Sequence, residues 1–254
     1  MQTTDGDADI NIDVSTGPFT LDDTAGIDAG SGVDQLSSLT ISADSMDLQS
    51  DHSPTEMTAD ENITLVADDG SILVGTPSIA TDMFAQQDIE AFASAPGAAT
   101  GNFTQVVGSG SSMVASSGHV SVQADGNITI DPATAGTFID MAAEGDVDIT
   151  GDVTANRGHV YVRADSGDGS GGPADGTGDI NVTGAGTRVF ADDADGDGDG
   201  VIWMLGQNMN IGTLGSNPTG GLQADGSISG DVVPGREFGL ALLAQNNLSY
   251  DAEL

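Results

Sequence analysis

Hydrophobic and polar residues alternate along short segments of this chain, and the same alternating shape recurs through most of its length. In each copy an apolar strand ends in a small residue, a polar turn follows, and a second alternating strand completes the unit. The clearest copies cover 119–130 and 138–149, and the others cover 39–48, 63–74, 202–211 and 240–250. Repeats of this length indicate stacked supersecondary units.

The first inward apolar residue of each copy gives the spacing of the repeat. Most steps fall between 17 and 24 residues, and one step of 42 residues separates Val160 from Ile202. The copies at Phe103 and Leu222 are weak, and their register stays open at this stage. The first residues are Leu39, Ile63, Met83, Phe103, Val120, Ile139, Val160, Ile202, Leu222 and Leu240.

This pattern predicts an all-β fold, a right-handed parallel β-helix with about 20 residues per coil, built from two strands and a third short segment. The Gly-Asx turns at Gly126 and Gly145 are expected to adopt positive φ. An antiparallel sandwich of hairpins is the rival architecture. Only 83–95 has a composition that also suits a helix. Small residues are expected at one corner of each coil, at Ala43, Ala67, Ala124, Ala143 and Ala164.

Alternation also predicts which side chains point into the core, because successive residues of a strand face opposite sides of the sheet. The best-ordered part should run from His119 to Val162. The inward columns there are expected to contain Val120, Val122, Ile128, Ile130, Ile139, Met141, Val147, Ile149, Val160 and Val162.

The whole chain, 1–254, is expected to be a single solenoid. Residues 1–38 are interpreted as irregular edge rungs. The segments 165–178 and 191–200 are rich in Gly and Asp, so they are expected to project as corner-loop insertions.

The net charge of the chain limits the classes of binding partner that can be expected. Forty acidic residues face four arginines and no lysine, which gives a net charge of −36. Such a surface repels nucleic acids and anionic membranes, so neither is expected as a partner. An Asp-rich, Lys-free surface is also typical of salt-loving organisms, whose medium screens self-repulsion. There is no cysteine, and there is no run of 18 apolar residues.

Three segments carry a family resemblance. Residues 126–130, 145–149 and 178–182 read Gly-Asn-Ile-Thr-Ile, Gly-Asp-Val-Asp-Ile and Gly-Asp-Ile-Asn-Val. They resemble the haemagglutinin-type repeats of filamentous haemagglutinin-like surface proteins, over roughly two thirds of the chain. The resemblance implies a β-helical shaft that bacteria export, often within a very large adhesin. The Asn-Pro-Asn motifs of that family's secretion module do not occur here, so the resemblance is to the shaft region.

One Asp/Gly segment has the chemistry of a calcium loop. Alternating aspartates offer hard oxygen ligands on a flexible backbone, as Ca²⁺ requires. The position of the final bidentate Glu of an EF-hand holds Gly206, so the predicted site is a simpler Asp-Gly loop, with a solvated acidic corner as the alternative. The predicted ligands are Asp192, Asp193, Asp195, Asp197 and Asp199. The stretch 165–175 is a weaker candidate of the same kind.

Other candidate chemistry is sparse. His119 and His159 begin equivalent strands and could stack, but a histidine metal site generally needs further ligands. With 40 acidic residues, carboxylate pairs carry no information about glycoside hydrolysis. No nucleophile elbow, phosphate loop or zinc motif is present. No catalytic or cofactor-binding residue is therefore predicted, and the chain is expected not to be an enzyme.

The expected function is a non-catalytic structural or adhesive shaft, outside the cell or on the bacterial cell surface. Its expected partners are further copies of itself, end to end, or a glycan or protein of a cell surface. Two alternatives remain open. The chain could be a subunit of a self-assembling extracellular fibre, because an uncapped β-helix exposes strand edges. It could also be an enzyme that acts on polysaccharides.

Overall fold

The structure is a computed structural model of the 254-residue chain. It describes residues 9–22, 25–29, 37–49, 57–95, 101–164, 178–183, 187–192, 200–212, 221–224 and 240–250. These residues form strands and turns and include no helix. Strands from successive coils pair in parallel along two long sheets, so the predicted parallel β-helix is confirmed.

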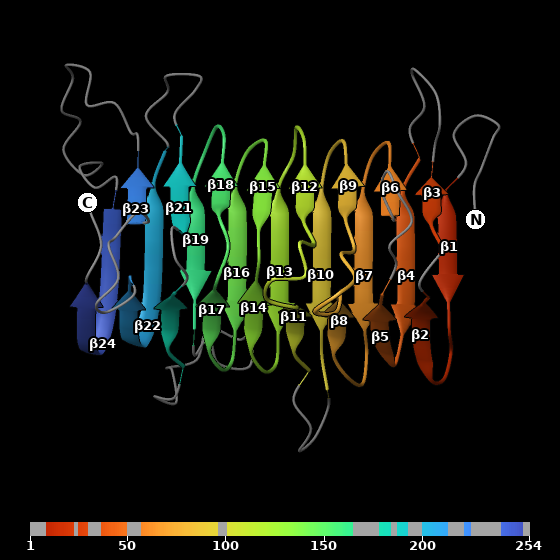
Figure 1. The fold of residues 1–254 in the computed structure, drawn as a ribbon, viewed down its shortest axis with the longest axis horizontal. Helices are drawn as coiled ribbons and strands as arrows, with labels where there is room; N and C mark the ends of the chain where they lie inside the picture. Colours follow the sequence, from red (N-terminus) through yellow and green to blue (C-terminus); the bar gives the residue numbers. More distant parts are fainter. Residues whose placement is uncertain are drawn as a thin grey trace.

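Most coils contribute three strands, one to each of three rows along the rod (Figure 1). The first row is β1 (Ile10–Asp13), β4 (Leu39–Ala43), β7 (Ile63–Ala67), β10 (Ile89–Ala93), β13 (Val120–Ala124), β16 (Ile139–Ala143), β19 (Val160–Arg163), β22 (Ile202–Ile211) and β24 (Leu240–Tyr250). The second row is β2 (Pro18–Leu21), β5 (Ser45–Leu48), β8 (Ile72–Val74), β11 (Phe103–Gln105), β14 (Ile128–Ile130), β17 (Val147–Ile149) and β20 (Ile180–Val182).

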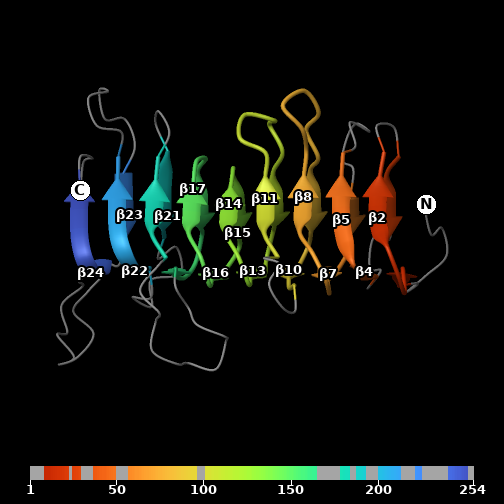
Figure 2. The same cartoon turned by 90° about the horizontal axis from the view of Figure 1, so that it is seen from below.

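The third row forms a sheet of its own, with eight strands (Figure 1). The view from below shows the second row in front (Figure 2). It contains β3 (Ile27–Ala29), β6 (Met57–Ala59), β9 (Met83–Ala85), β12 (Met113–Ala115), β15 (Ala133–Ala135), β18 (Val153–Ala155), β21 (Arg188–Ala191) and β23 (Gly221–Ala224). The first and second rows join into one 16-stranded sheet, because β22 is long enough to pair with β19 and with β20.

The core lies along the axis of the coils. Strand residues alternate between buried and partly exposed positions, as in the pattern of β7. All ten side chains that were predicted to face inward between Val120 and Val162 are buried, with at most 1 % of their surface exposed. Equivalent inward residues align from coil to coil, so each apolar side chain packs on the counterpart one coil away.

The length of a coil varies more than the sequence predicts. First strands begin at the residues that open β1, β4, β7, β10, β13, β16, β19, β22 and β24. Only the coils that begin at Val120 and Ile139 are close to 20 residues long. The predicted starts at Met83 and Leu222 are wrong, because both residues lie on third-row strands, and Phe103 lies on a second-row strand.

Segment 83–95 is strand, not helix, because it contains β9 and β10. The rival hairpin sandwich is excluded by the parallel pairing of the strands. Strands β1, β2 and β3 form a first coil that pairs in register with the strands of the second coil. The segments 165–177 and 193–199, which contain most of both predicted insertions, lie outside the described residues.

Alanines mark two corners of each coil. The predicted column at the end of the first strands is confirmed for Ala43, Ala67, Ala124 and Ala143, which align in register together with Ala93. The predicted Ala164 is buried directly after β19. A second column closes the third strands, which the sequence pattern did not reveal. It consists of Ala29, Ala59, Ala85, Ala115, Ala135, Ala155, Ala191 and Ala224.

The Gly-Asx turns have a different role from the predicted one. Positive φ occurs at Gly17, Gly75, Gly108, Gly110 and Gly212, and not at Gly126 or Gly145. At Gly145 the need is for space, because an added Cβ would collide with the side-chain oxygen Oδ1 of Asn127 in the preceding coil.

Asn127 belongs to a ladder of side chains that precedes the second-row strands. The side-chain oxygen of each member except the last accepts the backbone N–H of the next member, one coil further on, and Asn127 accepts that of Asp146 at 2.8 Å. The ladder contains Ser71, Asn102, Asn127, Asp146, Asp179 and Asn208. It supplies acceptors for N–H groups at a corner where the sheet pairing ends.

Candidate binding surface

A second column of polar residues precedes the first-row strands and changes character half-way along the rod. In the early coils it uses Asx side chains, since Asn62 Oδ1 accepts the backbone N–H of Asp88 at 3.1 Å. In the next three coils the equivalent positions hold His119, Phe138 and His159, each one residue before a first-row strand.

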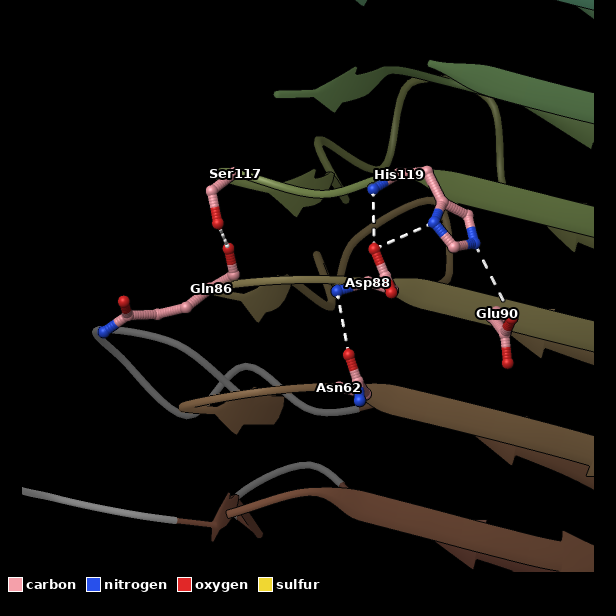
Figure 3. Close-up of polar contacts among 6 residues, drawn as sticks. All are labelled: Asn62, Gln86, Asp88, Glu90, Ser117 and His119. Carbon is pink, nitrogen blue, oxygen red and sulfur yellow. Dashed lines mark hydrogen bonds and ion pairs between the residues drawn. The ribbon is translucent and has the colours of Figure 1, made fainter. Parts of the chain in front are cut away.

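His119 lies at the junction of these two parts (Figure 3). Oδ1 of Asp88 accepts its backbone N–H at 2.9 Å and lies 2.8 Å from its Nδ1. The other ring nitrogen, Nε2, lies 3.6 Å from Oε1 of Glu90. Two carboxylates therefore hold the imidazole from the side of the preceding coil.

On the other side, His119 begins a stack of rings. The centroids of His119 and Phe138 lie 4.6 Å apart with 5° between the planes, and those of Phe138 and His159 lie 5.0 Å apart with 6°. The expected stacking of the two histidines is therefore mediated by Phe138. Because a phenyl ring separates them, the two imidazoles cannot share a metal ion.

The stack continues onto the outward face of the first row. Tyr161 and Trp203 occupy paired outward positions of β19 and β22. The His159 and Tyr161 rings meet edge to face at 6.1 Å and 78°, and the centroids of Tyr161 and Trp203 lie 3.9 Å apart at 45°. We refer to His119, Phe138, His159, Tyr161 and Trp203 as the aromatic strip.

Two charged residues border the strip, and each carries a buried atom without a hydrogen-bond partner in the described structure. These atoms are Oδ1 of Asp140 and Nε of Arg163. Asp140 pairs in register with Tyr161, and Arg163 lies two residues further along the same strand. A buried polar atom without a partner costs free energy, and two of the four such atoms in the described residues lie at this border.

Burial also shifts the ionisation of this group. Burial raises the pKa of the Asp140 carboxyl, and the charges of Arg163, His159 and His119 oppose that shift. Burial lowers the pKa of His159, opposed by the Asp140 charge. For Tyr161 burial raises the pKa of the phenol. Shifts that burial dominates are typical of groups held away from water on a protein surface.

The predicted calcium loop is described only at its first residue. The backbone N–H of Asp192 donates to the carbonyl of Ala155 at 2.8 Å. Asp193, Asp195, Asp197 and Asp199 lie outside the described residues, as does the weaker candidate at 165–175. Within the described ranges no group of three or more His, Asp or Glu side chains is arranged to hold a metal ion.

The sequence reading singled out His119 and His159 but missed Phe138, Asp140, Tyr161, Arg163 and Trp203 as one group. The available signal was the position of these residues in the repeat. Phe138 precedes a strand as the two histidines do, and Asp140, Tyr161 and Trp203 follow the first inward residue of three successive first strands.

Comparisons of the chain with protein-family models, with curated proteins and with solved structures found no match. Within the described ranges, no helix has the length and hydrophobicity that crossing a lipid bilayer requires.

Proposed function

We propose that this protein is a non-catalytic structural and adhesive shaft, located outside the cell or on a bacterial cell surface. The observation that carries the proposal is an unbroken inward column through seven coils. Every member of the column has no exposed surface, and members pair in register. The column consists of Leu39, Ile63, Ile89, Val120, Ile139, Val160 and Ile202.

Such a column supports a spacer role because each coil is stabilised mainly by its two neighbours, so the rod can have any length. Successive coils are about 4.8 Å apart, the usual distance between paired strands. The side-chain ladders add hydrogen bonds at the corners between strands. The resemblance of the Gly-Asx segments to haemagglutinin-type repeats supports the surface location.

Electron microscopy and an activity assay test this proposal together. The purified protein should image as uniform rods. It should release no reducing ends from a panel of neutral and acidic polysaccharides. Turnover that is lost on substitution of Asp140→Asn would overturn the proposal and favour the polysaccharide-acting enzyme.

One observation favours a second candidate, a subunit of an extracellular fibre. Leu248 of β24 aligns with the buried Met209 of β22, yet half of its surface is exposed. An inward residue that is exposed on the last described strand could be covered by a coil of another copy stacked upon β24. Long unbranched filaments in the same micrographs would support the fibre, and rods of one length would support the shaft.

A further inference from the structure

We propose that the aromatic strip, together with Asp140 and Arg163, binds a neutral oligosaccharide whose chain runs along the rod. This inference rests on the proposed adhesive function and names the class of ligand that the surface would hold.

The length of the strip sets the size of the ligand. It extends from the coil of His119 to the coil of Trp203, which are three coil steps apart in the first row. At the usual strand spacing these steps cover about 14 Å. That length suits several linked sugar rings better than a single one.

Ring orientation provides a surface on which sugars can pack. The planes of His119, Phe138 and His159 are nearly parallel, so these three rings cover one another's faces. The Tyr161 ring is turned by 78° from His159. The Trp203 ring lies against Tyr161 with centroids 3.9 Å apart at 45°, so these two rings depart from the parallel stack, and both residues are partly exposed. Sugar C–H groups pack on partly exposed aromatic rings because the face of such a ring carries partial negative charge.

The polar atoms at the border of the strip indicate which hydrogen-bonding groups the ligand should carry. Oδ1 of Asp140 needs a donor and Nε of Arg163 needs an acceptor. Both residues are partly exposed as a whole, so a ligand on the strip lies beside part of each side chain. A hydroxyl group can donate and accept, so neighbouring hydroxyls of one sugar satisfy both requirements.

Charge and the width of the strip argue against two other classes of ligand. An anionic glycan meets a protein of net charge −36. A stable interface with a folded protein buries about 800 Å² of surface on each partner. The strip is only one or two side chains wide, and the carboxylates Asp88, Glu90 and Asp140 lie along it.

The chain has one tryptophan, so the fluorescence of Trp203 reports on this site alone. The probes are cellohexaose, laminarihexaose and xylohexaose as neutral ligands, and oligoalginate and heparin hexasaccharide as anionic ones. At least one neutral probe should shift the emission of Trp203 and saturate, and calorimetry should give the same affinity. The anionic probes should not bind.

Variants locate the site. Tyr161→Ala and Arg163→Gln should each weaken the binding at least tenfold. Phe92→Ala is the matched control, because Phe92 occupies an outward position of β10 outside the strip, and it should leave the affinity unchanged. Circular dichroism of each variant checks that the β-helix is intact.

The inference fails if no neutral probe binds, if the anionic probes bind as tightly, or if Phe92→Ala weakens the binding as much as Tyr161→Ala. Capture of a protein without saccharide binding would also overturn it. These failures leave the shaft proposal standing as long as the protein images as rods and cleaves no polysaccharide. Cleavage of a bound probe would instead overturn the shaft proposal.

Discussion

Phe138 stacks on His119 almost in parallel, with ring centroids 4.6 Å apart. The two residues belong to adjacent coils, and each lies immediately before a first-row strand. The stack therefore joins coils through side chains outside the apolar core, in addition to backbone hydrogen bonds such as that from the Val120 N–H to the Phe138 carbonyl at 3.1 Å.

Replacing Phe138 should destabilise the rod. Phe138→Leu keeps the apolar volume but removes both ring contacts, those with His119 and with His159. Each aromatic pair contributes about 0.5–1.5 kcal/mol, so the free energy of unfolding should fall by about 1–3 kcal/mol. Phe92→Leu, on an outward phenylalanine outside the stack, is the control for denaturant melts. An equal loss in both variants would show that stacking contributes nothing of its own.

The Asp140 carboxyl should limit stability at neutral pH. Burial raises the pKa of this carboxyl. At pH values above the ordinary aspartate pKa, the folded state therefore binds more protons than the unfolded state. Stability therefore decreases as the pH rises through the window between the unfolded pKa, about 3.9, and the higher folded pKa. Asp140→Asn should raise the melting temperature at pH 7 and have no effect below the window.

The control for this change is Asp148→Asn in the next strand of the same coil. Oδ1 of Asp148 accepts a hydrogen bond from Asn181, and an asparagine in its place keeps that acceptor. A melting temperature of Asp140→Asn that equals the parent's at pH 7 would show that ionised Asp140 is well tolerated.

His159 should have the opposite effect, because its contribution to stability should decrease as the pH falls. Burial lowers its pKa, so the folded state binds fewer protons than the unfolded state below about pH 6.5. Its contribution to stability is lost as the pH falls through the window between 6.5 and the lower folded pKa. His159→Phe keeps a ring in the stack and should flatten the stability curve between about pH 5 and pH 8. Chemical denaturation at a series of pH values, compared with the parent, measures the change in slope.

The ladder before the second-row strands should depend on the oxygen of Asn127. Asn127→Ala removes the acceptor of the Asp146 N–H and should cost about 1–3 kcal/mol, whereas Asn127→Asp keeps an acceptor and should cost less. Gly145→Ala should also destabilise the parent, because its Cβ collides with Asn127 Oδ1. The collision disappears in the Asn127→Ala background, so a double-mutant cycle should show strong coupling. Additive losses would contradict this geometry.

The inward columns should not tolerate charge. Val122 and Met141 pair in register and have no exposed surface. Val122→Asp or Met141→Asp buries an unpaired carboxylate and should cost several kcal/mol. Gln123→Asp, at the exposed position next to Val122, should change the melting temperature little. Two core variants that melt like the parent would show the inward assignment to be wrong.

The sequence predicted the core better than the surface, and the reason is the strand itself. Alternation at period two decides which side chains share a face, so Val120, Val122, Ile139 and Met141 were assigned to the core before their neighbours were known. The coil boundaries around Met83 and Phe103 were missed. Third-row strands are only three residues long there, and three residues hold too little alternation to reveal a register.

The surface depended on information that no local pattern contains. Coils differ in length because their corner loops differ, so the spacing in sequence does not show that His119, Phe138 and His159 stack. The separation of Asp140 from water likewise depends on side chains that neighbouring coils bring to it. The sequence alone determined the class of fold and the inward columns, because each is encoded within single strands. Only the tertiary structure decided the ladders, the aromatic strip and the unpaired atoms beside it, because each depends on the register between coils.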